Sequence, residues 1–388
     1  MNSLKHVIEI AQQTWLIKQL QNPEIPWEWG ALSSNKNITW EIIQAFPDKK
    51  WNWERISYNP NITFDIIEAN LDKPWYGIGL GYNPNLTWDF VKAHPDKPWY
   101  GIGLGYNPNL TWDFVKAHPE IEWNMLGLSK HKCVTWEIVQ ENPDFGWMWY
   151  FLSCNPNITW EIIQATRYDT PWDNDMICEN PNISWDIIKA HPRHPWNYRI
   201  LSAHPNITWD IVKNNLHNAW DWTRLTAHKN ITLDILNDHM PYMGNSYISF
   251  HWDDIGLSKN PNITPAFVKA HPKQKWFYNE LSKNPNFTPD DVLKCGKDWL
   301  FYDYVCQNPN VTLEYILSSD RKYWNWWKLS LNESITKLPE AQMAHVAREY
   351  FAARTIQRVF LHAYYNPEHK FCKNRLQREF TDMAAISN

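Results

Sequence analysis

Apolar and polar positions repeat along nearly the whole chain with a period of 24 residues. In each copy an apolar residue precedes a threonine or serine, a short apolar run follows, and a tryptophan opens the second half. The threonine or serine falls at Thr39, Thr63, Thr87, Thr111, Thr135, Thr159, Ser184, Thr208, Thr232, Thr264, Thr288 and Thr312. Repetition at this period predicts a solenoid, in which each unit buries its apolar face only against its neighbours.

The first half of each copy is predicted to be a short helix that begins after this hydroxyl residue. A threonine at this place accepts a hydrogen bond from a free N–H of the first turn. Pro265 and Pro289 follow the threonine directly, and proline is favoured at the first helical position. The residue before the threonine and the one four after it, such as Ile38 and Ile43, are both apolar and predict a hydrophobic staple.

The second half begins with a tryptophan at a constant phase and has room for one or two turns of α- or 3₁₀-helix. This phased tryptophan stands at Trp27, Trp51, Trp75, Trp99, Trp123, Trp147, Trp172, Trp196, Trp220, Trp252, Trp276, Trp299 and Trp324. Helices this short are unstable alone, so stacking must stabilise them and the tryptophans should be mostly interior. We therefore expect an all-α solenoid of about thirteen units over residues 10–336. Residues 337–388 would form a C-terminal capping helix and a basic tail.

Two stretches of the repeat carry a family resemblance. Residues 284–293, NPNFTPDDVL, resemble the leucine-rich repeat variant family, which implies alternating α- and 3₁₀-helices in a superhelix. The tryptophan-rich form, NPNISWDIIKAHP at 180–192, resembles tandem-repeat proteins of giant, mimivirus-like DNA viruses. Residues 352–380 are similar to the tails of proteins from those viruses. Neither resemblance implies a defined biochemical activity.

Composition narrows the classes of partner and compartment. The net charge is −5, with no basic stripe of the kind that wraps nucleic acid. No apolar run approaches membrane-spanning length, and the N-terminus does not read as a signal peptide. The six cysteines show no paired spacing, and we expect them to be reduced. We expect a cytoplasmic protein, in the host cytoplasm if viral, that is not secreted; packaging in the virion stays open.

The candidate binding residues form an aromatic series two positions after the phased tryptophan. Its members are Trp53, Trp149, Tyr198, Trp222, Tyr278 and Trp326, with Phe301 in the same phase. If exposed, such a ladder could bind an extended peptide or stack on sugar rings; core packing is the competing interpretation. His94 and His118 lie one repeat apart, too far to share a metal ion in their stacked orientation. No catalytic spacing is present, so neither an enzyme nor a cofactor is expected.

Three irregularities interrupt the pattern. The two YGIGLG copies predict the softest second helices at 76–81 and 100–105, because glycine disfavours helix. Residues 240–250 are an insertion, which we interpret as a tolerated surface loop or as a binding loop. Ile356 and Gln357, in a helix expected over 340–365, resemble part of a calmodulin-binding IQ motif but lack its basic residue and glycine. The leading function is a non-enzymatic scaffold that binds a protein partner; the alternative is a carbohydrate- or small-ligand-binding module that uses the aromatic ladder.

Overall fold

The computed structural model describes residues 3–95, 99–239, 252–294, 299–319, 323–365 and 374. Over these residues all regular structure is helical, which confirms the all-α repeat prediction. The chain divides into two compact units: one spans Trp27–Ile335, and the other joins Met1–Pro26 to Thr336–Asn388. The unit that contains the repeats therefore starts at Trp27, whereas the predicted solenoid started at residue 10. The insertion at 240–250 and the basic tail lie outside the described residues.

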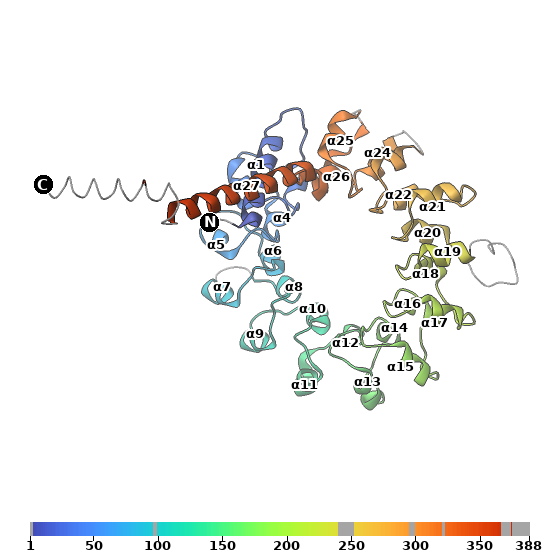
Figure 1. The fold of residues 1–388 in the computed structure, drawn as a ribbon. Helices are drawn as coiled ribbons and strands as arrows, with labels where there is room; N and C mark the ends of the chain where they lie inside the picture. Colours follow the sequence, from blue (N-terminus) through green and yellow to red (C-terminus); the bar gives the residue numbers. More distant parts are fainter. Residues whose placement is uncertain are drawn as a thin grey trace. The chain divides into compact units, whose positions relative to one another are not determined.

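The described residues of the Trp27–Ile335 unit form twelve short first helices and thirteen short second helices. Figure 1 shows the odd- and even-numbered helices as two rows. The odd-numbered first helices are α3 (Trp40–Ala45), α5 (Phe64–Glu68), α7 (Trp88–Ala93), α9 (Trp112–Ala117), α11 (Trp136–Glu141), α13 (Trp160–Thr166), α15 (Trp185–Ala190), α17 (Trp209–Lys213), α19 (Leu233–His239), α21 (Pro265–Ala270), α23 (Pro289–Leu293) and α25 (Leu313–Ser318).

The even-numbered second helices each follow a phased tryptophan, except α24, which begins at one. They are α2 (Trp29–Leu32), α4 (Trp53–Ser57), α6 (Gly77–Tyr82), α8 (Gly101–Leu104), α10 (Met125–Lys130), α12 (Trp149–Leu152), α14 (Asn174–Ile177), α16 (Tyr198–Leu201), α18 (Trp222–Thr226), α20 (Asp254–Lys259), α22 (Tyr278–Leu281), α24 (Trp299–Val305) and α26 (Trp326–Leu331). All of them are α-helical. In the described part of the chain, 3₁₀ geometry occurs at η1 (Pro143–Phe145) and η4 (Glu333–Thr336).

The local signals of the first helix act as the sequence predicts. The Thr87 hydroxyl accepts a hydrogen bond from the Phe90 N–H at 3.3 Å, and ten further copies repeat this cap. Pro265 and Pro289 occupy the start of their helices. Ile38 and Ile43 are both buried, as a hydrophobic staple requires.

The phased tryptophans are buried or half-buried wherever their side chains are described. Trp51 is 8% exposed, and its indole N–H donates to the Phe46 carbonyl at 2.9 Å. The same bond, to the carbonyl five residues earlier, recurs at Trp75, Trp99, Trp123, Trp147, Trp196, Trp220 and Trp276. These eight indoles therefore pack with their polar N–H hydrogen-bonded.

Asparagine side chains connect each repeat to the one before it. Asn83 is fully buried, and its Nδ2 donates to the carbonyls of Ser57 and Ile62, both at 3.0 Å. Its Oδ1 accepts from the Asn85 N–H at 2.9 Å, which shapes the turn. Asn85 in turn donates to the Pro60 carbonyl at 2.7 Å. Both asparagines therefore hold neighbouring repeats together through their side chains.

A serine at the end of the second helix adds another connection. The Ser57 hydroxyl donates to the Trp53 carbonyl at 2.7 Å and accepts from the Tyr76 N–H of the next repeat at 2.9 Å. Ser33, Ser129, Ser153, Ser202 and Ser258 accept in the same way. Because these groups are buried, leaving one unmatched would cost about 1–3 kcal/mol.

The same connections join the last repeat of this unit to its first. Asn35 donates to the Ser330 carbonyl at 3.0 Å, and the Ser330 hydroxyl accepts from the Glu28 N–H at 3.0 Å. The Trp27 and Trp326 rings meet edge to face at 6.0 Å. An open superhelix would leave these groups of the terminal repeats without partners. Repeats Trp27–Ile335 therefore form a closed ring, a feature that the 24-residue pattern did not predict.

Glycines allow an unusually close approach of α6 and α8. A Cβ added to Gly103 would lie 2.4 Å from the Ile78 carbonyl oxygen, and one added to Gly81 would lie 2.8 Å from the Gly103 carbonyl carbon. Both distances are shorter than atoms tolerate, and the obstacle is backbone. The glycines that the sequence suggested would soften these helices thus have a packing role.

The second unit pairs its two long helices, α1 (Leu4–Leu20) and α27 (Glu340–Tyr365), which contact each other. Gln12 on α1 donates through Nε2 to the Thr336 carbonyl at 2.7 Å and accepts from the Leu338 N–H. Among the described residues, no helix is long and apolar enough to cross a bilayer.

Candidate functional site

The predicted aromatic ladder lies between repeats. Trp53 meets the phased tryptophan of the next repeat, Trp75, edge to face, with ring centroids 5.1 Å apart at 89°. Trp149, Tyr198 and Trp222 contact Trp172, Trp220 and Trp252 in the same way, and Trp326 contacts Trp27. Tyr278 instead packs on Phe301 at 5.9 Å. All six candidate rings are half-buried, and each already has an aromatic partner.

Trp29 extends this series, because its ring meets Trp51 edge to face at 5.1 Å. The predicted series began one repeat later, at Trp53. Since edge-to-face pairs add about 0.5–1.5 kcal/mol beyond area burial, the ladder contributes to the cohesion of the ring.

The exposed aromatic side chains come from other positions of the second half. On three consecutive second helices and the residues beside them, six large side chains are between 37% and 46% exposed: Tyr58, Tyr76, Tyr82, Tyr100, Ile102 and Tyr106. We call these six residues the tyrosine surface. The 24-residue pattern did not predict their exposure, although five of the six belong to the two glycine-rich YGIGLGY copies.

The helices that carry the tyrosine surface are neighbours. Helix α4 contacts α6, and α6 contacts α8. The Tyr82 and Tyr106 rings stack with centroids 5.8 Å apart and planes at 22°. Burial of its phenol, with a smaller effect from Tyr82, raises the pKa of Tyr106.

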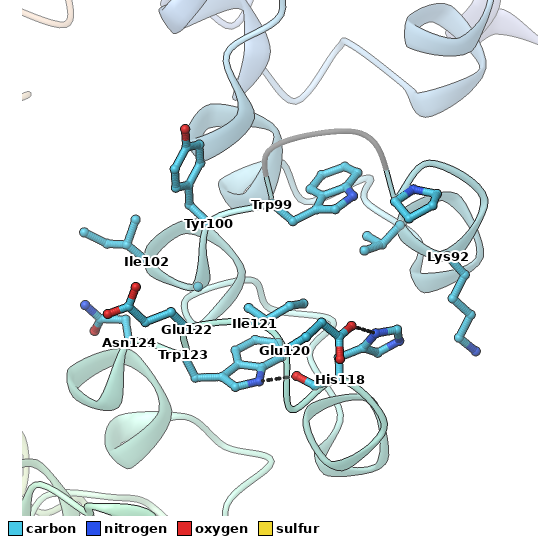
Figure 2. A pocket seen from close by; sticks show the side chains of 13 residues that line it. Lys92, Trp99, Tyr100, Ile102, His118, Glu120, Ile121, Glu122, Trp123 and Asn124 are labelled. Atoms are coloured by element: carbon cyan, nitrogen blue, oxygen red, sulfur yellow. Dashed lines mark hydrogen bonds and ion pairs between the residues drawn. The ribbon is translucent and has the colours of Figure 1, made fainter.

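A cavity of about 710 Å³ lies beside this surface and shares Tyr100 and Ile102 with it (Figure 2). In the view of Figure 2, these two residues lie at one end and His118 and Glu120 at the other. Trp123, on the wall between them, donates its indole N–H to the His118 carbonyl at 3.0 Å. The cavity size suits a side chain or short segment of a partner.

His118 and Glu120, two polar residues of the cavity, bond to each other. His118 Nδ1 lies 2.7 Å from Glu120 Oε1, and this hydrogen bond lowers the pKa of the carboxyl. The His118 ring also stacks on Phe114 at 4.2 Å. His94 repeats this stacking on Phe90 one repeat earlier. In the described parts of the chain, no three His, Cys, Asp or Glu side chains form a group that could hold a metal ion.

A second cavity, of about 730 Å³, marks the repeat that is one residue longer than the others. Arg167, Tyr168, His191 and Arg193 are among its lining residues. Tyr168 is 83% exposed, and the Arg167 guanidinium lies over its ring at 4.5 Å. This cavity does not touch the tyrosine surface.

Helix α27 of the other unit exposes apolar residues along its second half. Phe351, Ile356, Val359 and Leu361 are all exposed. Ile356, the first residue of the IQ-like pair, is thus accessible on a helix. The calmodulin interpretation stays a prediction.

No family model, curated protein or solved structure matches this chain. The resemblance to the leucine-rich repeat variant and to giant-virus repeat proteins therefore stays a prediction.

Proposed function

We propose that the protein is a non-enzymatic scaffold that binds a protein partner through the tyrosine surface. The observation that carries the proposal is the concentration of exposed tyrosines on and directly beside α4, α6 and α8. Tyrosine is enriched at protein interfaces because it combines a large apolar ring with a hydroxyl that can hydrogen-bond. Isolated exposed apolar residues are ordinary, but a continuous group of them indicates a contact surface.

The backbone beneath the tyrosine surface also suits binding. Asn83 and Ser57 fix α4 against α6 through buried hydrogen bonds, and Asn107 continues the series by donating to the Gly81 carbonyl at 2.7 Å. A surface that is ordered before binding loses less conformational entropy in the complex. The adjacent cavity would accept an anchoring side chain of the partner.

Cross-linked affinity purification tests this proposal. The full-length chain would be used as bait, in infected cells if the viral resemblance holds. We expect a protein partner whose cross-links fall on residues 54–130. The double variant Tyr82→Ala/Tyr106→Ala should weaken binding about 30-fold or more, as loss of a hot spot of about 2 kcal/mol would.

Tyr168→Ala is the matched control, because this residue is more exposed than any member of the tyrosine surface and lies outside it. It should leave the affinity unchanged. Full binding by the double variant, or cross-links confined to other repeats, would refute the role of the tyrosine surface. Recovery of no protein partner would count against the scaffold itself.

The alternative, a carbohydrate- or small-ligand-binding module, needs free aromatic faces on the ladder. Each ladder ring already packs against a ring of the next repeat, so the arrangement favours the scaffold. Glycan-array binding that is lost in Trp149→Ala and Trp222→Ala, with the fold intact, would reverse this preference.

A further inference from the structure

Thirteen N-P-N-like turns connect the repeats, and three of them have histidine at the first asparagine position. Asparagine occupies this position in ten turns, whereas His131, His204 and His228 occupy it in the others. The position is buried or half-buried in all three histidine copies. A titratable imidazole therefore occupies a position at which the other ten turns have a neutral amide.

The histidines reproduce both hydrogen bonds of the amide. His131 Nε2 lies 2.9 Å from the Asn107 carbonyl of the preceding repeat, and its Nδ1 accepts from the Cys133 N–H at 3.1 Å. His204 makes the same pair, to the Asn180 carbonyl at 3.2 Å and from the Asn206 N–H at 3.3 Å.

His228 follows the same pattern. It accepts from the Asn230 N–H at 3.1 Å and bonds to the backbone of His204. A carbonyl can only accept and a backbone N–H can only donate. These partners therefore require the neutral ring that carries its proton on Nε2.

We propose that His131, His204 and His228 are acid-sensitive joints, which hold neighbouring repeats together at neutral pH and loosen when their rings are protonated. The added proton would sit on Nδ1, facing a backbone N–H. That hydrogen bond would be lost, and a positive charge would be left in a largely buried turn. Asparagine has no such transition, so the other ten turns would be unaffected.

The surroundings of the three rings disfavour the charged form. Burial lowers the pKa of His131, His204 and His228 below the usual value. Lys132 acts in the same direction on His131, as does Lys229 on His228, whereas the hydrogen bonds to the Asn107, Asn180 and His204 backbones oppose the effect of burial. Within the described residues, no carboxylate is among the groups that shift these three pKa values.

The direction of the pH effect follows from these shifts. As the pH falls through the ordinary histidine pKa near 6.5, the unfolded chain binds protons before the folded one. Stability contributed by the joints is therefore complete above that pH and falls as the solution is acidified. The loss ends below the lowered folded-state pKa, where both states are protonated.

The triple variant His131→Asn/His204→Asn/His228→Asn tests the proposal, because asparagine already serves at this position in ten copies. The urea midpoint of the full-length protein and of the variant would be measured between pH 8 and pH 5. Hydrogen exchange would be followed at residues 131–135, 204–208 and 228–232. On acidification, we expect the urea midpoint of the natural protein to fall and its amides at these turns to exchange faster. The triple variant should keep its hydrogen-exchange protection at these turns.

His217→Asn is the control, because His217 is exposed and lies outside the N-P-N-like turns. The urea midpoint and the hydrogen exchange of this variant should change with pH as they do in the natural protein. An equal loss of protection in the natural protein and the triple variant would overturn the proposal. If the triple variant does not fold, NMR titration of the three rings in the natural protein decides: a folded-state pKa at or above the ordinary value overturns the proposal.

Discussion

Replacing Asn35 by alanine tests whether the ring of repeats is closed. Asn35 is 1% exposed, donates to the Ser330 carbonyl at 3.0 Å and accepts from the Asn37 N–H at 3.0 Å. In an open array this residue would belong to the first repeat, with no preceding repeat to receive its amide. Only in a closed ring does its side chain hold two repeats together.

The expected cost follows from the groups left behind. Truncation removes the donor to Ser330, whose side chain is fully buried, and an unmatched buried carbonyl costs about 1–3 kcal/mol. The lost bond to the half-buried Asn37 N–H adds about 0.5–1.5 kcal/mol. The free energy of unfolding should therefore fall by roughly 2–4 kcal/mol.

Equilibrium unfolding in urea, followed by tryptophan fluorescence, measures this change. Asn83→Ala is the matched control, because Asn83 makes the same bonds at a junction that the chain itself crosses. The two variants should lose similar stability. If Asn35→Ala stays within about 0.5 kcal/mol of the natural protein while Asn83→Ala is strongly destabilised, the ring is open in solution.

Two further predictions concern packing and thiol chemistry. Gly103→Ala should lower the free energy of unfolding by at least about 1–3 kcal/mol, because its Cβ would lie 2.4 Å from the Ile78 carbonyl oxygen. In Gly30→Ala the new Cβ meets no atom within 4 Å, so the midpoint temperature of thermal unfolding should be unchanged or higher. Burial raises the pKa of Cys306 to about 12 and that of Cys178 to about 11. Iodoacetamide at pH 8 should therefore label these two thiols only after denaturation, and rapid labelling of the native protein, read by mass spectrometry, would contradict the buried placement.

The local elements could be predicted from sequence because their signals act within a few residues. Thr87 caps its helix through an N–H three residues away, and Pro265 fits only the start of a helix. The second helices were harder to predict. Their four to seven residues suit α or 3₁₀ geometry equally, and the structure shows α-helix in all of them.

The candidate site was predicted less well, for a physical reason. In a four-residue helix such as α12, periodicity cannot show which side faces a neighbour. The ladder position of Trp149 is half-buried, whereas the next residue, Tyr150, is exposed. Closure of the ring was invisible for a related reason: it depends on a small rotation at each junction, and no single residue encodes the sum.

Closure also limits how such a gene can evolve. Residues 73–96 and 97–120 differ only at their last position, so duplication of whole copies has occurred within this chain. An open array could gain or lose a copy freely, since each end stays an end. A closed ring of thirteen copies has no such freedom. A fourteenth copy would require a smaller rotation at every junction between repeats. Copy number is thus constrained by geometry, while the surface of each copy remains free to diverge.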